Sequence, residues 1–512
     1  MLTLTSALQN TIRLYGGNRA IVDAEVELTW RDYGAGIART AGMLRELGVD
    51  KGQRFGIVGR NSYRQAELIN AGFWSGSVPV PVNYRLAPRE IAAILDDAEC
   101  RYLALDAAFA ALLETPELQG WRERALFLEP GSYDDLKSAA SPLSLVEAEE
   151  DDDALMLYTG GTTGRGKGVR LSHRNIVANA LQIMRVLSPR EDDVFLHTTP
   201  MFHAADMKST IFTMFGAAHS YLPEFTPVAL LGAIERYRVT VAGLIPTTIL
   251  RLLDEPRFKD FDLSSLRLIS YGTSPILPPL IRRTMAAFPG VDMQQFYGLT
   301  ECSPYLSTLD QAAHRQALDG DEQVLSSAGR PLPGTDLRIL DDTGNEVPCG
   351  QSGEIVVRGP QVTKGYHNRP QEQAAAYREH GFHTGDMGRL DENGYLYLLD
   401  RKRDIVITGG ENVYTREVEE VLGQHPGVRE VSVVGVPDAE YGEALFAVIV
   451  ANPSWQPSSD ELIEHCRPLI GGYKIPRKLA FVDALPKNAL GKVLKQDLRE
   501  TYGAKAGELE SA

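Results

Sequence analysis

The 512-residue sequence contains few cysteines and no long apolar run. Its four cysteines, Cys100, Cys302, Cys349 and Cys466, lie far apart and form no CxxC pair. That spacing excludes a disulfide scaffold and a cysteine zinc site, and it favours a reducing compartment. No stretch approaches the roughly 18 uninterrupted apolar residues of a membrane span, and the N-terminus lacks the pattern of a signal peptide. We therefore expect no membrane span and a cytoplasmic location.

Basic residues are outnumbered by acidic ones, and the formal net charge is −16. Nucleic acid binding needs a basic face, so we expect no nucleic-acid partner. The exception is the segment 467–505, which has nine Lys and Arg against three Asp and Glu, a local excess of +6. Such a segment is either a solvated helix surface or a docking surface for a polyanionic small molecule.

The chain shows no internal repeat, and its length suggests roughly three folding units. Residues 1–145 alternate strand-like runs, such as FGIVGRN, with helix-like runs, such as APREIAAILDDA. This alternation is typical of βαβ units around a parallel sheet. Residues 335–400 instead show short strands with turn signals, and a compact region begins near residue 401. We predict an α/β fold with a large N-terminal domain, 1–399, that includes a small β-rich lobe, and a small α+β C-terminal domain, 401–512.

A glycine-rich stretch has the spacing of a phosphate-binding P-loop, from Gly161 to Gly166-Lys167. A P-loop needs a hydroxyl after its lysine and a helix after the loop, but Gly168 follows here. GVRLSH is typical of another short strand, and helix signals begin only at Ser172. The hydroxyls lie upstream, at Thr159, Thr162 and Thr163. The stretch therefore predicts a phosphate-binding loop of another kind, and the alternative is a glycine-rich hairpin without a ligand.

The same stretch, YTGGTTGRGKG at 158–168, resembles the signature of the adenylate-forming superfamily, Tyr-Thr-Ser-Gly-Thr-Thr-Gly-x-Pro-Lys-Gly. Gly160 stands for the Ser and Gly166 for the Pro. Further motifs of the family follow in order: PMFH (200–203), YGTSP (271–275), YGLTE (297–301), HTGD (383–386), DRKRDIVITGGENVY (400–414) and PKNALGK (486–492). The chain thus resembles acyl-CoA synthetases and their relatives over nearly its whole length.

The resemblance implies an acid–thiol ligase that uses ATP, Mg²⁺ and coenzyme A. A carboxylic acid would react with ATP to give acyl-AMP and pyrophosphate, and the CoA thiol would then displace AMP. Three alternatives stay open: an amide synthetase that transfers the acyl group to an amine, a P-loop ATPase, and a non-catalytic relative. The last of these would be expected to lack Lys492 or Glu301, and both are present. We expect a monomer or a homodimer.

Four residues are expected to act in catalysis on this resemblance: Lys492, Glu301, Thr300 and His203. Lys492 would neutralise charge between the attacking carboxylate and the α-phosphate, and Thr300 would lie near that phosphate. Glu301 is a hard oxygen ligand suited to Mg²⁺, and the resemblance adds Thr159 as a second metal ligand. His203 would wall the acyl pocket and could also help to deprotonate a thiol. On their own, such residues are typical of a helix start, a solvated surface or a packed core.

The resemblance also implies a set of cofactor-binding residues. Tyr297 would stack on adenine, Asp386 would accept both ribose hydroxyls, and Arg401 would reach the same sugar. Without the resemblance, these residues would be assigned to the core or to a surface ion pair. The full predicted set is Thr159, Gly160, Gly161, Thr162, Thr163, Gly164, Lys167, Gly272, Thr273, Ser274, Gln295, Phe296, Tyr297, Gly298, Asp386, Leu398, Arg401, Gly409, Gly410 and Lys474.

The resemblance further implies that the C-terminal domain rotates about a hinge at Asp400, withdrawing Lys492 and bringing Gly410 towards the pantetheine. Lys474 and Arg477 of the basic segment would then attract the phosphates of CoA. The acyl pocket is expected at Phe202, His203, Met207, Tyr271 and Gly272. Its neighbours are mainly apolar, which favours a fatty or aryl acid, whereas Asp206 and Lys208 leave room for a polar substrate.

Overall fold

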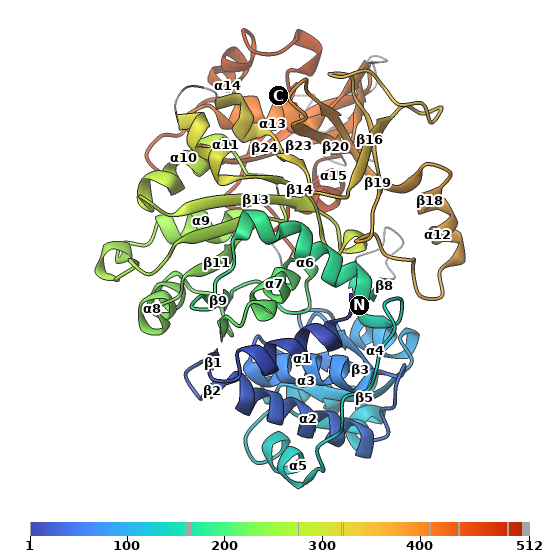
Figure 1. The fold of residues 1–512 in the computed structure, drawn as a ribbon. Coiled ribbons are helices and arrows are strands. Elements are labelled where there is room, and N and C mark those ends of the chain that lie inside the picture. The colour runs from blue at the N-terminus through green and yellow to red at the C-terminus, as the bar shows by residue number, and fades with distance from the viewer. Residues whose placement is uncertain are drawn as a thin grey trace.

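The computed structural model describes residues 2–159, 166–274, 276–318, 320, 322–402, 404–408, 411–438, 441–488 and 491–503. The N-terminal region lies at the bottom of Figure 1 and the C-terminal region at the top, with a broad central sheet between them. Within the described ranges, every helix is too short or too polar to cross a membrane.

A four-stranded parallel sheet in the order β4-β3-β5-β6 organises the N-terminal region. Its strands are β3 (Arg54–Val58), β4 (Val78–Pro81), β5 (Cys100–Leu105) and β6 (Ala125–Phe127). Around it lie α1 (Leu4–Leu14), α2 (Trp30–Glu46), α3 (Tyr63–Ser75), α4 (Pro88–Asp97), α5 (Tyr133–Ala139), η1 (Ala107–Glu114) and η2 (Gln119–Arg124). The predicted parallel sheet within residues 1–145 is therefore confirmed.

The central sheet has nine strands in the order β15-β14-β13-β12-β11-β9-β10-β1-β2. They are β1 (Arg19–Val22), β2 (Glu27–Thr29), β9 (Val194–His197), β10 (Ala218–Tyr221), β11 (Val241–Leu244), β12 (Leu268–Gly272), β13 (Asp292–Gly298), β14 (Tyr305–Leu309) and β15 (Arg330–Pro331). Strands β9 to β13 are parallel and almost wholly buried, as expected of a sheet that is covered on both faces. Ligands commonly bind beyond the carboxyl ends of such strands.

The helices of this region connect the strands of the central sheet. They are α6 (His173–Leu187), α7 (Ser209–Met214), α8 (Pro227–Tyr237), α9 (Pro246–Leu253), α10 (Pro278–Ala287), α11 (Gln311–Leu318), η3 (Ala204–Lys208), η4 (Phe258–Asp260), η5 (Thr300–Cys302) and η6 (Glu322–Ser326). The first connection after β9 is η3, followed directly by α7. The predicted PMFH motif therefore leads from a buried strand into a short helix.

The glycine-rich stretch lies between β7 (Asp153–Thr159) and β8 (Lys167–Ser172), which pair antiparallel with Thr159 opposite Lys167. Helix α6 begins only after β8, where the Ser172 hydroxyl accepts a hydrogen bond from the backbone N–H of Asn175. A strand and not a helix thus follows the glycine loop, as predicted, and the geometry of a P-loop is absent from this part of the described chain.

A small β-rich lobe follows, built from β16 (Asp336–Leu340), β17 (Gly353–Arg358), β18 (Tyr377–Arg378), β19 (Gly381–Leu390) and β20 (Leu396–Arg401), with α12 (Pro370–Ala376) beside it. It matches the lobe predicted at 335–400. Strand β20 runs through Asp400 and Arg401, so the predicted boundary falls at the end of a paired strand.

The C-terminal region has its own sheet, in the order β22-β21-β24-β23 with β25 beside β24. Its elements are β21 (Val406–Thr408), β22 (Glu411–Val413), β23 (Val428–Asp438), β24 (Gly442–Ala451), β25 (Lys478–Phe481), α13 (Thr415–Gly423), α14 (Ser459–Cys466), α15 (Lys495–Gly503) and η7 (Gly472–Lys474). Two hydrophobic clusters cover the faces of this sheet and contain no residue of the central sheet. The predicted fold class, a large α/β part followed by a small α+β part, is confirmed.

Candidate active site between the two regions

A cavity of about 1130 Å³ lies between the central sheet, the β-rich lobe and the C-terminal region. Its lining includes Arg416 and Glu419 from the C-terminal region and Pro246 and Thr247 from the start of α9. Ten of the predicted cofactor-binding and catalytic residues line it: Thr273, Ser274, Gln295, Phe296, Tyr297, Gly298, Asp386, Leu398, Arg401 and Lys492. Residues more than 200 positions apart in the chain therefore share one chamber.

Three of these residues form a hydrogen-bonded network. Asp386 in β19 lies directly opposite Arg401 in β20, and the Arg401 Nε is 2.6 Å from the Asp386 Oδ1. The Tyr297 hydroxyl, at the end of β13, donates to the Asp386 Oδ2 at 2.7 Å. Burial and the Asp386 charge raise the pKa of Tyr297 well above its usual value, so the phenol keeps its proton. Burial is the largest single effect on Arg401 and lowers its pKa, but Asp386 and the other acidic groups nearby together outweigh burial and raise the pKa, so the guanidinium stays charged.

The turn after β12 brings backbone close to this network. A Cβ on Gly272 would lie only 2.3 Å from the Phe296 carbonyl oxygen of β13, so only glycine allows the two strands to approach this closely. Thr273 follows with φ of +70°, a left-handed conformation that is rare for a β-branched residue. Backbone strain of this kind concentrates at ligand sites, where the surrounding structure holds it.

Lys492 enters the cavity on a tight hairpin of the C-terminal region. Its backbone N–H donates to the Asn488 Oδ1 at 3.0 Å, and its carbonyl accepts from the Asn488 N–H at 2.8 Å. Gly491 has φ of +75°, and a Cβ there would lie 2.4 Å from the Thr247 Oγ1 at the start of α9. The glycine thus allows the backbone just before Lys492 to approach the start of α9 and to present Lys492 to the chamber.

His203 lies close enough to Lys492 for the two charges to interact. Burial lowers the pKa of His203 to about 4; Asp206 opposes the shift, and the positive charges of Lys208 and Lys492 add to it. The ring is therefore neutral near pH 7. Its Nδ1 accepts a hydrogen bond from the Ala205 N–H at 3.1 Å, which leaves the proton on Nε2. A donor at Nε2 favours the predicted role as a wall of the acyl pocket over the role as a base.

The predicted metal ligands lie at the glycine hairpin. Glu301 follows Thr300 in η5, and its Oε1 accepts a hydrogen bond of 3.0 Å from the Tyr366 hydroxyl. The ammonium of Lys167 lies 5.3 Å from the centre of the same tyrosine ring. Tyr366, which the sequence did not suggest, thus joins the carboxylate to the hairpin. Gly160, Gly161, Thr162, Thr163 and Gly164 lie outside the described residues, as do Gly409 and Gly410.

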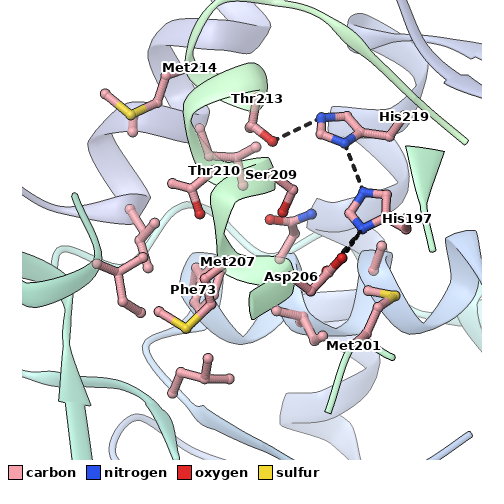
Figure 2. Close-up of a pocket in the computed structure, with 18 of the residues that line it drawn as sticks. Phe73, His197, Met201, Asp206, Met207, Ser209, Thr210, Thr213, Met214 and His219 are labelled. Carbon is pink, nitrogen blue, oxygen red and sulfur yellow. Dashed lines mark hydrogen bonds and ion pairs between the residues drawn. The ribbon is translucent and has the colours of Figure 1, made fainter. Parts of the chain in front are cut away.

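The predicted acyl-pocket residues have different neighbours, and the pocket itself stays a prediction. His203 and Met207 line a second cavity of about 100 Å³ together with residues of α1, α3 and α7 (Figure 2). Phe202 packs edge-on against Tyr84. The Tyr271 hydroxyl is hydrogen-bonded to the His314 Nε2 at 2.7 Å, and Tyr271 belongs to the hydrophobic cluster that α9, α10 and α11 cover.

Figure 2 shows a chain of hydrogen bonds along this second cavity. Both carboxylate oxygens of Asp206 lie 2.9 Å from the His197 Nδ1, and the His197 Nε2 lies 3.0 Å from the His219 Nδ1. The chain ends at Thr213, whose hydroxyl is 3.0 Å from the His219 Nε2. Asp206 therefore turns its charge towards His197.

The basic segment is largely compensated in space. Lys474 contacts both Glu417 oxygens, at 2.7 and 2.8 Å, and the Arg477 guanidinium lies 3.7 Å above the Tyr441 ring. Further pairs join the segment to carboxylates of preceding elements: Lys487 with Glu430, Lys495 with Glu419, and Arg499 with Asp404. The sequence did not reveal these partners. The role of Lys474 in CoA binding stays a prediction.

Asp400, the predicted hinge, joins the two regions. Its Oδ2 accepts hydrogen bonds from the backbone N–H and the hydroxyl of Thr415, at 2.8 and 2.7 Å, and so caps the start of α13. Its Oδ1 accepts from the Arg401 N–H at 2.8 Å. The boundary and the hinge stay predictions.

Comparison with known proteins agrees with this arrangement. A family model for AMP-binding enzymes matches residues 8–367, and one for the AMP-binding enzyme C-terminal domain matches residues 417–492. A feruloyl-CoA synthase from Amycolatopsis is 35% identical over 485 residues, 93% of this chain and 94% of the relative.

Two solved structures extend the similarity to the whole fold. ATP-bound MatB from Rhodopseudomonas palustris has a TM-score of 0.89 and 32% identity, and the amide bond synthetase McbA from Marinactinospora thermotolerans has a TM-score of 0.89 and 29% identity. Each alignment covers 98% of this chain and 99% of the other.

Proposed function

The chain belongs to the family of AMP-binding enzymes, and from that premise we propose that it is an AMP-forming acid–thiol ligase. It activates a carboxylic acid with ATP and transfers the acyl group to coenzyme A. The observation that carries the proposal is the chamber of about 1130 Å³ in which Tyr297 of the central sheet and Asp386 and Arg401 of the β-rich lobe meet Lys492 of the C-terminal region.

In the first step, an oxygen of the substrate carboxylate attacks the α-phosphorus of ATP. The bond from that phosphorus to the β-phosphate oxygen breaks, and pyrophosphate leaves with the electron pair. Lys492 approaches from the C-terminal hairpin and neutralises the negative charge shared by the attacking carboxylate and the α-phosphate. A positioned ammonium in a partly enclosed site is the kind of electrostatic contact that lowers such a barrier most.

The network around Asp386 positions the nucleotide. We assign the Asp386 carboxylate to the two ribose hydroxyls, Tyr297 to one face of adenine, and the Gly272–Ser274 turn to its edge. Arg401 holds the Asp386 carboxylate in place from the opposite strand and can itself reach the sugar. The strained φ of Thr273 supports this assignment, because such strain concentrates at ligand sites.

Glu301 and Thr159 fit a magnesium ion that ATP brings with it. Mg²⁺ is usually held by one or two carboxylates together with substrate phosphates and water, so a single glutamate suffices. The Tyr366 hydroxyl keeps the Glu301 carboxylate turned towards the hairpin. When bound, the ion would neutralise phosphate charge.

In the second step, the thiol sulfur of CoA attacks the acyl carbon of acyl-AMP. The bond to the AMP oxygen breaks, AMP leaves, and the thiol proton passes to water. We propose that the C-terminal region rotates about Asp400 between the steps, which would remove Lys492 from the chamber. Lys474 would then attract the phosphates of CoA, after its ion pair with Glu417 has broken.

The test is a screen of carboxylic acids for pyrophosphate release from ATP, with the nucleotide product identified in each case. AMP is the expected product, and ADP would overturn the proposal. Adding CoA should convert the acyl-adenylate to a thioester, identified by mass spectrometry. Formation of an amide from an added amine, with no thioester from CoA, would instead assign the chain to the amide synthetases, which McbA represents.

A further inference from the structure

Lys208 is a buried cation, and no carboxylate of the described residues pairs with it. It ends η3, its residue is 5% exposed, and it forms no ion pair with any residue of the described chain. Its hydrogen bond there is to the Ser270 Oγ, at 3.0 Å. An ammonium has three donors, so two remain for another acceptor.

The nearest candidate for a counter-ion, Asp206, does not contact this ammonium. Both Asp206 oxygens are directed at the His197 Nδ1, as Figure 2 shows. The Asp206 charge acts on Lys208 only at longer range, where it raises the pKa of the lysine against the stronger lowering effect of burial. The pKa of Lys208 is about 8, so the side chain is still mainly charged at neutral pH.

The ammonium lies against strands β11 and β12, close to the turn that we assign to the nucleotide. Ser270 precedes Gly272 by two residues in β12, so both face the same side of the sheet, about 7 Å apart along the strand. On the neighbouring strand, a Cβ on Gly243 would lie 2.7 Å from the Lys208 Nζ, so glycine leaves the space that the ammonium occupies. Lys208 and Lys492 both act on the pKa of His203, which places His203 near both cations.

A buried and incompletely bonded ammonium lowers the stability of a fold, and an apolar side chain of similar length would be tolerated better. An anionic group of the substrate, placed beside Nζ, would supply the missing partner. The acid's reacting carboxylate belongs beside Lys492, so this second anion must be at the other end of a short acyl chain.

We propose that Lys208 is a specificity-determining residue that selects acids with a second carboxylate, so that the substrate class is the short dicarboxylic acids. This inference rests on the proposed acid–thiol ligase function. It departs from the fatty or aryl acid that the apolar neighbours of the pocket favour.

The experiment compares matched pairs of acids that have equal numbers of carbons: malonic with propionic, succinic with butyric, and glutaric with valeric acid. Wild-type enzyme, ATP and CoA are used, and kcat/KM is obtained from pyrophosphate release. We expect the best diacid to exceed its monoacid partner by about 10- to 100-fold, the range of one hydrogen-bonded charge pair. Equal or better activity with the monoacids would overturn the inference and leave the ligase function intact. If no acid in a broad screen led to pyrophosphate release, the proposed ligase function itself would be overturned.

The variant Lys208→Met tests the residue directly, because methionine is similar in length and carries no charge. The preference for the diacid should fall at least tenfold, while activity on the monoacid is kept or increased. Lys51→Met, which removes an exposed lysine paired with Asp152, is the matched control and should keep the wild-type preference. The melting temperature of Lys208→Met should equal or exceed that of wild type. A lower melting temperature together with a proportional loss on both acids would assign Lys208 to the structure alone and overturn the inference.

Discussion

Replacing Asp386 tests its assignment to the ribose, and the structure indicates how far kcat/KM for ATP should fall. A carboxylate has about four lone-pair positions. The Tyr297 hydroxyl occupies one on Oδ2, and the Arg401 Nε occupies one on Oδ1. One position per oxygen therefore remains, which matches the two neighbouring hydroxyls of a ribose.

Each hydrogen bond to a charged group contributes about 1.5–3 kcal/mol. Losing two would cost about 3–6 kcal/mol, or roughly a 10²- to 10⁴-fold decrease in kcat/KM for ATP. Arg401, released from Asp386, can still reach the sugar, so we expect Asp386→Ala to fall in the lower half of this range. Asp386→Asn keeps one oxygen and should lose about 10- to 100-fold. The KM for the acid should change much less in both variants.

The assay pairs each enzyme with ATP and with 2′-deoxy-ATP, as a double-mutant cycle between protein and substrate. Wild type should lose about tenfold or more with the deoxynucleotide, whereas Asp386→Ala should lose little further, because the acceptor is already absent. Asp342→Ala, an exposed carboxylate of the same lobe, is the control. If Asp386→Ala discriminated against 2′-deoxy-ATP as strongly as wild type does, Asp386 would not bind the ribose.

Three further predictions concern Lys492, the neighbouring Gly491 and the buried Lys208. Lys492→Ala should slow acyl-AMP formation about 10²- to 10³-fold. Thioester formation from supplied acyl-AMP should stay near the wild-type rate, with both steps measured by single turnover. Equal slowing of both steps would refute the proposal that the C-terminal region rotates between them. Gly491→Ala should slow adenylation, because the added Cβ would lie 2.4 Å from the Thr247 Oγ1. Adding Thr247→Ala should restore part of the rate. No recovery would mean that this close approach does not position Lys492. Burial lowers the pKa of Lys208 from 10.5 to about 8, which corresponds to a cost of about 3 kcal/mol for burying the charged form. This cost lowers the stability of the folded state in full below pH 8. Between pH 8 and 10.5 the unfolded state binds more protons than the folded state, so stability rises with pH and the cost disappears. Denaturant unfolding should therefore find Lys208→Met more stable than wild type at neutral pH, by up to about 3 kcal/mol, with the gap closing as the pH rises to 10.5; a constant gap would contradict the burial of a charged lysine.

The sequence predicted those features that depend on local pattern or on an ordered set of motifs. The strand after the glycine loop follows from GVRLSH, and the start of α6 follows from the capping Ser172. The meeting of Tyr297, Asp386 and Arg401 followed from the family resemblance and not from any property of the single residues.

Contacts between distant segments could not be predicted from local pattern. Nothing around Tyr366 indicates that its hydroxyl would hold Glu301, 65 positions away. The partners of the basic segment come from α13, β23 and the loop before β21, so its local charge excess overstated the positive charge that a ligand would meet. The burial of Lys208 against Ser270 depends on the packing of η3 on β12, which no local signal encodes.

The division of the chamber among elements determines how such a chain can diversify. The residues that we assign to the nucleotide lie on β13, β19 and β20. The register of β19 and β20 aligns Asp386 with Arg401, and Tyr297 of β13 is hydrogen-bonded to Asp386, so a change in one of them disturbs the others. Lys208, to which we assign the choice of acid, is the last residue of η3, and within the described chain its hydrogen bond goes to Ser270 and not to a residue assigned to the nucleotide. A substitution within η3 can therefore change the accepted acid while the adenylating apparatus is inherited intact. New substrate preferences can arise by single replacements there, without passing through an inactive ancestor.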